Sequence, residues 1–222
     1  MTLSLSLAED NMNIFCSTRH IPAGKLFKGK KGFTLIEMAF ILVIIGILVG
    51  MGAELLPMLV KQSKLKETRA IVKEVKTAIT GYALAKGSLP CASTTEDGSE
   101  DNGTYIGYLP YADLGINGND SYQGTLFYAV DPYLADTDID TPEEFKTALS
   151  ELINGTPSPD LFCDGTNIKA AFVVFSAGKN LQADAPNDDG NNQFAKPGAP
   201  ETASYDDILD AVSLTYLYGR FD

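Results

Sequence analysis

Apolar residues are unevenly distributed along this chain, and their pattern divides it into three parts. Residues 1–32 mix polar and apolar residues, whereas residues 33–60 are almost wholly apolar. Because about 20 helical residues span the hydrocarbon core of a membrane, residues 33–60 predict a helix long enough to cross a bilayer. From Leu65 to Tyr82, apolar residues recur at a spacing near that of one helical turn. This spacing predicts that the helix continues in amphipathic form.

The predicted helix begins at Phe33 and ends near Lys86, because Gly87 and Pro90 are typical of the residues just beyond a helix end. Proline removes a backbone hydrogen bond from a helix, and glycine weakens it. Pro57 and the cluster Gly50-Met51-Gly52 therefore predict a kink or local melting inside this helix.

The remaining residues, 87–222, consist of short apolar runs between turn-rich segments, which predicts a compact head. Strands are predicted at residues 125–130, 170–176 and 211–218. Thr141-Pro142-Glu143-Glu144 predicts a helix start, with a capping threonine, proline at the first position and glutamate at the third. That helix is expected to end at Asn154-Gly155. A few strands in one antiparallel sheet against the long helix indicate the α+β fold class.

Charge is also segregated along the chain. The first 32 residues are basic, and residues 87–222 contain 5 basic and 23 acidic residues, a net charge of −18. A surface this acidic repels nucleic acid and anionic lipid and suits solubility or cation binding. We therefore predict no nucleic-acid partner.

One carboxylate, Glu37, lies near the start of the apolar run. An isolated carboxylate in a membrane costs several kcal/mol unless it is paired, and the run contains no basic residue that could pair with it. An ordinary secretory signal peptide is the weaker interpretation of this segment, because the run is long and no good cleavage site follows it.

The segment Lys30-Lys31-Gly32-Phe33-Thr34-Leu35-Ile36-Glu37 resembles the type IV prepilin signal of pilins and type II secretion pseudopilins. The resemblance implies that prepilin peptidase cleaves between Gly32 and Phe33 and methylates the new Phe33 amine. It also implies that Glu37 pairs with the amine of a neighbouring subunit and sets the axial register. The alternative is that Glu37 reaches the membrane interface or is protonated in lipid.

The same resemblance implies four segments: a cleavable basic leader (1–32), a transmembrane half-helix (33–60), an amphipathic half-helix (61–86) and an extracytoplasmic head (87–222). Met12 is an alternative start within the leader. The implied fold is pilin-like, with the long N-terminal helix packed under a small antiparallel sheet. Segments of the head, such as Gly107-Tyr108-Leu109-Pro110, also resemble a group of larger pilin-like proteins.

The implied function is that of a structural subunit of a type IV pilus or a type II secretion pseudopilus. The size of the head favours a minor subunit. The implied location is the bacterial inner membrane, with one crossing and a periplasmic head, and then the filament. The implied partners are prepilin peptidase, other pilin or pseudopilin subunits, an inner-membrane assembly platform and membrane lipid before assembly. Two alternatives are a membrane-anchored extracytoplasmic binding protein with an uncleaved helix, and a secreted soluble head.

Cysteine and histidine limit the chemistry that the mature protein could perform. Cys16 lies in the leader, so cleavage would leave Cys91 and Cys163. A pair in a head that leaves the cytoplasm predicts a disulfide, and the alternative is two buried free thiols. The only histidine, His20, also lies in the leader, which excludes histidine-based zinc sites and catalytic triads from the mature chain. We therefore do not expect an enzyme.

Acidic loops provide one candidate ligand site, for calcium. Calcium takes six to eight oxygen ligands from flexible, loop-rich backbone. The run from Asp184 to Asn192 and the later Asp206-Asp207 pair supply carboxylates, and they loosely resemble the calcium loop of major pseudopilins. The candidate ligands are Asp184, Asp188, Asp189, Asp206 and Asp207. The alternative is a solvated acidic loop without an ion.

Overall fold

The computed structural model describes residues 32–135, 138–139 and 141–221. Most of the predicted leader, including Cys16, His20 and Met12, lies outside these described residues. The described residues divide into two units, one that ends at Met51 and one that runs from Gly52 onward.

The helix α1 runs from Leu35 to Lys86, close to the predicted bounds. It contains Pro57 and both Gly50 and Gly52 without interruption, so the predicted local melting is not observed. Its N-terminal part is long and apolar enough to cross a membrane, and none of that stretch is buried. Among the described residues no other helix meets this criterion of length and composition.

Six strands in the described residues form one curled sheet around the long strand β4. They are β1 (Ile106–Tyr108), β2 (Phe127–Val130), β3 (Phe162–Cys163), β4 (Ile168–Ser176), β5 (Gln193–Phe194) and β6 (Ile208–Ser213). β4 pairs antiparallel with β2, β3 and β6, and β1 pairs antiparallel with β2. β3 and β5, however, are parallel, so the sheet is mixed and not purely antiparallel as predicted. A parallel pair needs a long crossover connection, and residues 164–192 provide it.

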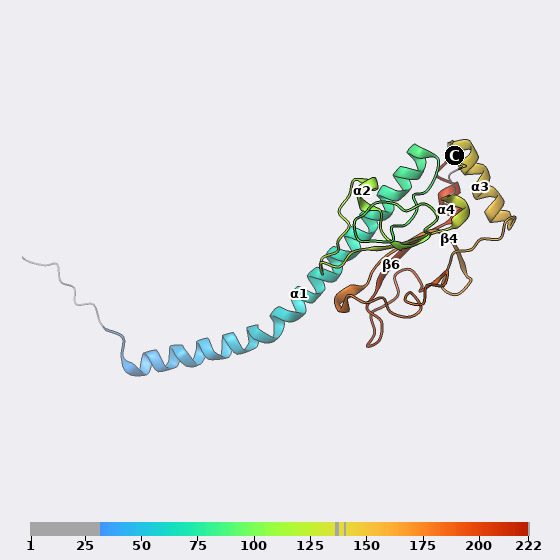
Figure 1. Ribbon diagram of the computed structural model, residues 1–222. Coiled ribbons are helices and arrows are strands. Elements are labelled where there is room, and N and C mark those ends of the chain that lie inside the picture. Colours follow the sequence, from blue (N-terminus) through green and yellow to red (C-terminus); the bar gives the residue numbers. More distant parts are fainter. Residues whose placement is uncertain (1–31, 136–137, 140, 222) are drawn as a thin grey trace, which may run out of the picture. The chain divides into compact units, whose positions relative to one another are not determined.

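The helices of unit 52–222 cover one face of this sheet (Figure 1). Alternate residues of β4 point to opposite faces, and Phe172 and Val174 point towards the helices. The C-terminal part of α1 packs Val72, Val75 and Ile79 against them. The helices α3 (Pro142–Asn154) and α4 (Leu214–Tyr218) add further buried leucines to the same cluster. Burial of each such side chain stabilises the fold by about 1.5–3 kcal/mol, so this cluster attaches the helix to the head.

The other face of the sheet carries a second buried cluster. Val173 and Phe175 of β4 point into it, together with Phe194 of β5. The ring of Phe175 stacks on Phe127 at a centroid distance of 5.0 Å and lies 5.9 Å from Phe194. The loops around the short 3-10 helix η2 (Gly178–Asn180) follow β4 directly. The sheet thus separates two apolar clusters, one under the helices and one under the loops.

The predicted helix start at Thr141 is confirmed in α3. Thr141 Oγ1 accepts a hydrogen bond from the Glu144 amide (3.3 Å), and the Thr141 amide donates to Glu144 Oε2 (3.2 Å). Gly155, with φ 82°, ends the helix in the left-handed conformation, as the sequence predicted. Two other short helical turns, α2 (Tyr111–Leu114) and η1 (Pro132–Leu134), were not predicted.

The predicted strand at residues 211–218 is wrong in its second half. β6 ends at Ser213, whose Oγ accepts a hydrogen bond from the Tyr216 amide (3.3 Å) and so caps α4. Leu214 and Leu217 of α4 are both buried in the core, three residues apart on one helix face. The apolar pattern of residues 211–218 is compatible with a strand or with a helix. The serine cap and the burial of the two leucines favour the helix after Ser213. The strands predicted at 125–130 and 170–176 are confirmed as β2 and β4.

Candidate functional site

The segment around Gly32 and Phe33 leads directly into α1. Both residues are exposed and lie outside regular structure. Thr34 begins the helix: its Oγ1 accepts from the Glu37 amide (3.3 Å) and its carbonyl oxygen from the Met38 amide (3.2 Å). Glu37 therefore lies in the first helical turn, where the helix dipole favours a negative charge.

Apolar side chains of α1 are exposed throughout the stretch that follows. Leu35 is 90% exposed and Phe40 is 65% exposed, and the exposure continues to Val60. Exposed apolar surface of this extent indicates contact with lipid or with another protein. No ion pair of Glu37 is formed within residues 32–135, 138–139 and 141–221.

In the head, three of the acidic loop residues come together. One carboxylate oxygen from each of Asp184, Asp206 and Asp207 lies within 4.8 Å of the other two. Asp207 is only 4% exposed, and its Oδ2 accepts hydrogen bonds from the Asp184 amide (2.9 Å) and Asn187 Nδ2 (2.8 Å). Its Oδ1 is buried and has no hydrogen-bond partner in the part of the chain that the structure describes.

Asp206 has the same arrangement of one satisfied and one unsatisfied oxygen. Its Oδ2 accepts from the amides of Lys179 and Asn180 (both 3.2 Å), whereas its buried Oδ1 has no partner within the described residues. This contact depends on Gly178, which has φ 63° and whose Cβ, if present, would lie 2.3 Å from the Asp206 carbonyl oxygen. Glycine at this position therefore lets η2 approach Asp206.

Burial of these carboxyl groups disfavours their charged forms. It raises the pKa of Asp207 to about 6, and it also raises the pKa of Asp206. The neighbouring Asp184 acts in the same direction on both. A bound cation would reverse this effect, because it stabilises negative charge and satisfies the two buried oxygens. The residues present therefore fit a hard cation.

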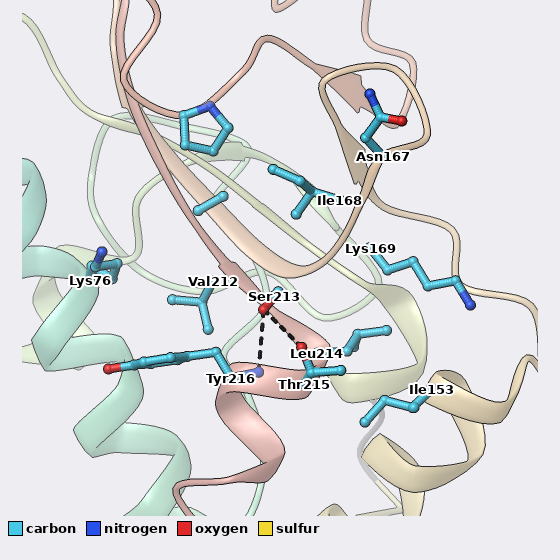
Figure 2. Close-up of a pocket in the computed structure, with 12 residues that line it drawn as sticks. Lys76, Ile153, Asn167, Ile168, Lys169, Val212, Ser213, Leu214, Thr215 and Tyr216 are labelled. Atoms are coloured by element: carbon cyan, nitrogen blue, oxygen red, sulfur yellow. Dashed lines mark hydrogen bonds between the residues drawn. The ribbon is translucent and has the colours of Figure 1, made fainter.

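A cavity of about 730 Å³ lies elsewhere in the head, at the end of β6. Figure 2 shows Ile168, Val212 and Leu214 beside it, so its wall is largely apolar. Ser213 Oγ contacts Thr215 Oγ1 and the Tyr216 amide, both at 3.3 Å. Ser213 thus serves as a helix cap, and its bonds do not resemble those of an activated nucleophile.

The predicted disulfide between Cys91 and Cys163 is not formed. Both cysteines are free and buried. Cys91 belongs to the cluster under the helices, and Cys163 to the cluster on the other face of the sheet. The sheet therefore lies between them, whereas a disulfide requires Cα atoms within about 7 Å. The alternative of two buried thiols describes the structure.

Residues 27–53 match the family model of the prokaryotic N-terminal methylation motif. The chain carries a type IV pilin/pseudopilin prepilin signal. The match includes Gly32, Phe33 and Glu37 and supports a type IV pilin-like or pseudopilin precursor. No curated protein and no solved structure matches this prepilin-type chain.

The structure brings together only part of the predicted calcium ligand set. Asp184, Asp206 and Asp207 converge, whereas Asp188 and Asp189 are exposed and lie outside the cluster. Asp189 Oδ1 instead accepts from the Asn191 amide (3.1 Å), which closes a local turn.

Asn187 was not predicted to belong to this site. It is 7% exposed, it donates to Asp207 and to the Tyr205 hydroxyl (3.3 Å), and its Oδ1 accepts from the Ala195 amide (2.9 Å). In the sequence, only the position of Asn187 inside the run from Asp184 to Asn192 indicated that it could belong to the site.

Proposed function

We propose that this chain is a structural subunit of a type IV pilus or a type II secretion pseudopilus. The proposal rests on one observation. Residues 27–53 match the methylation motif, and this segment includes the start of an exposed apolar helix. Subunits of this kind are processed by prepilin peptidase and assembled through the N-terminal helix. The proposed processing is cleavage between Gly32 and Phe33 followed by N-methylation of Phe33.

Assembly uses the new charge pair. Cleavage creates a positive amine at Phe33, and the Glu37 carboxylate of an adjacent subunit neutralises it inside the apolar bundle. A buried polar pair of this type fixes register, as buried polar residues do in coiled coils. The position of Glu37 in the first turn of α1 supports this role, because it keeps the carboxylate close to the helix start.

Before assembly, the subunit is held in the inner membrane by one crossing, with its head in the periplasm. The length and apolar composition of the N-terminal part of α1 support a membrane-spanning role. The inner-membrane assembly platform and membrane lipid are its other partners at this stage. The large head, residues 87–222, supports a minor subunit better than a small major pseudopilin.

Mass analysis of the mature protein separates this proposal from its rivals. The filament subunit is expected to begin at Phe33 and to carry one added methyl group at that residue. A membrane-anchored binding protein would retain residues that precede Phe33, and a secreted soluble head would lack the apolar helix. Either of those results would refute the proposal.

A second proposed function of the head is calcium binding. Asp184, Asp206 and Asp207 would hold the ion, and Asn187 would orient Asp207; the ion would supply local charge neutralisation and fix the loops together. The buried, unpartnered oxygens of Asp206 and Asp207 support it.

The test compares two variants in calcium titrations followed by calorimetry and thermal unfolding. Asp207→Asn is expected to abolish both binding and the calcium-induced rise in Tm. The double variant Asp188→Asn/Asp189→Asn, which removes two exposed carboxylates, is expected to retain both. Equal losses in the two variants, or no binding to the wild-type chain, would contradict the site.

A further inference from the structure

The exposed face of α1 within unit 52–222 carries a stripe of three cations. Lys66, Arg69 and Lys73 are spaced at i, i+3 and i+7, so they lie on one face of the helix, and all three are exposed. Every charged residue three or four positions from any of them is another cation. Like charges at these spacings destabilise a helix by a few tenths of a kcal/mol per pair. We call these three residues the cationic stripe.

Other cations of the same helix have partners in the head. Lys61 forms an ion pair with Glu201 (2.6 Å), Lys76 forms one with Asp210 (2.5 Å), and Lys64 lies 5.2 Å from the centre of the Tyr122 ring. The side chains of the cationic stripe form no hydrogen bond or ion pair within the described residues.

The loops nearest the stripe do not neutralise it. Arg69 and Lys73 line a cavity of about 340 Å³ whose other wall includes Glu201, Asp206 and Asp210. Glu201 and Asp210 already pair with the two lysines named above, and Asp206 accepts from the amides of η2. Within the described residues the stripe is therefore a charged face without an ion-pair partner, and a second molecule can supply the counter-charge.

The head supplies the complementary charge on a separate segment. Residues 87–145 contain 12 acidic residues and no lysine or arginine. Four exposed members of this set lie close in sequence, at Glu96, Asp97, Glu100 and Asp113. None of these four forms an ion pair within the described residues. We call them the acidic loop.

Internal hydrogen bonds hold this loop in one conformation. The Asp97 carboxylate accepts from the Ser99 amide (3.1 Å), which lowers the pKa of Asp97, and Asp113 Oδ2 accepts from the Glu100 amide (2.7 Å). The acidic loop is thus held by its own hydrogen bonds, and those at Asp97 favour the charged form of that carboxyl group.

We infer that the cationic stripe of one copy docks against the acidic loop of a second copy. The inference rests on the proposed function and adds that copies of this chain contact one another directly in the filament. Two complementary surfaces at different places on one molecule make a head-to-tail contact, which generates an open filament unless the rotation happens to close a ring. Charge complementarity of this kind selects the partner and its orientation.

Anionic lipid is the competing partner for a cationic stripe. With the membrane-spanning segment ending at Val60, Lys73 lies about 20 Å further along the helix. The polar layer of a bilayer leaflet is only about 5–8 Å thick. The acidic head would also be repelled from an anionic membrane. These observations favour the acidic surface of a second copy.

A charge-swap experiment with the full mature chain in detergent tests the inference. One variant reverses the stripe (Lys66→Glu/Arg69→Glu/Lys73→Glu), and a second reverses the loop (Glu96→Lys/Asp97→Lys/Glu100→Lys). Each alone is expected to raise the concentration needed for self-association by about tenfold or more. The mixture of the two is expected to restore it to within about threefold of wild type, because opposite charges face each other again.

The control variant Lys169→Glu/Lys179→Glu/Lys196→Glu makes the same change in net charge at exposed lysines outside the stripe. It is expected to self-associate as the wild type does, and the wild-type association is expected to weaken at high salt. Thermal unfolding of every variant, checked against wild type, confirms that loss of association does not reflect loss of fold.

Three outcomes would overturn the inference: unchanged self-association of the stripe variant, failure of the mixture to recover, or loss only of binding to vesicles that contain anionic phospholipid. If Glu37→Ala abolishes assembly while the stripe variant assembles normally, the proposed function stands and the inference alone falls. A wild-type chain that is cleaved after Gly32 and enters filaments but never self-associates would refute the inference alone.

Discussion

Thr34 and Glu37, which follows it three residues later, define the start of α1. The threonine hydroxyl satisfies the Glu37 amide, and the Glu37 side chain remains exposed. A carboxylate at this point in an apolar helix is costly in lipid unless a cation neutralises it. At the scale of single residues, the proposed assembly mechanism is correct only if the Phe33 amine of a neighbouring subunit neutralises the Glu37 carboxylate.

The variant Glu37→Ala is therefore expected to be cleaved normally but to enter filaments poorly, because the Phe33 amine of its neighbour loses its counter-charge. Intact mass measures processing, and quantification of sheared filaments measures incorporation. The matched control is Glu54→Ala, which removes the other acidic residue of the apolar run and is expected to incorporate as wild type does. Normal incorporation of Glu37→Ala would contradict the pairing.

Asp131 makes the stability of the head depend on pH. It is 1% exposed, and burial raises its pKa above the ordinary value of 3.8, while its oxygens accept from the amides of Tyr133 (3.1 Å) and Asp160 (2.9 Å). Because the folded state binds this proton more tightly than the unfolded state, the contribution of Asp131 is fully present below about pH 4 and is lost as pH rises through the raised pKa.

Substitution Asp131→Asn is expected to destabilise the protein at low pH, where one amide hydrogen bond is lost without compensation. The deficit relative to wild type should shrink as pH increases, since the wild type must then ionise a buried carboxyl group. Urea unfolding at several pH values measures it. Asp188→Asn, at an exposed position, is the control and should match wild type at every pH.

At the scale of elements, helix boundaries followed from local chemistry where the capping residues were present. The start of α3 at Thr141 and its end at Gly155 appeared as predicted, because both depend on contacts within four residues. The start of α4 after Ser213 was missed, since the serine cap competed with an alternating pattern that suited a strand.

The capping box of α3 gives a direct test at this scale. Thr141→Ala is expected to lower the free energy of unfolding by about 1 kcal/mol, because the Glu144 amide loses its acceptor. Thr147→Ala in the same helix is the matched control. The Thr147 hydroxyl donates to the Glu143 carbonyl oxygen (2.9 Å), a bond within the helix that alanine can forgo because alanine favours helix. Equal destabilisation by both variants in chemical unfolding would contradict the capping role.

At the scale of the whole head, the position of the sheet decides the state of the cysteines. Cys91 and Cys163 lie in clusters on its two faces, and burial raises the pKa of both thiols, that of Cys163 to about 12. A thiol that is both buried and protonated reacts slowly, because the thiolate is the nucleophile.

The native mature chain is therefore expected to resist a thiol-alkylating reagent and to take up two labels once unfolded, without prior reduction. Mass analysis before and after unfolding counts the labels. Purification under reducing and non-reducing conditions serves as the control and should give the same count. A count of zero in the unfolded, unreduced chain would show that a disulfide had formed after all.

Linear patterns of the sequence by themselves determined the long helix, its apolar half, the processing motif, the start of α3 and the strands β2 and β4. Each of these depends on neighbours in sequence, through periodicity, capping or a short motif. The parallel β3–β5 pair, the two faces of the sheet that separate Cys91 from Cys163, and the convergence of Asp184 with Asp206 and Asp207 were decided only by tertiary structure. These features join segments distant in sequence, and their geometry depends on burial and strand pairing, which no local pattern encodes.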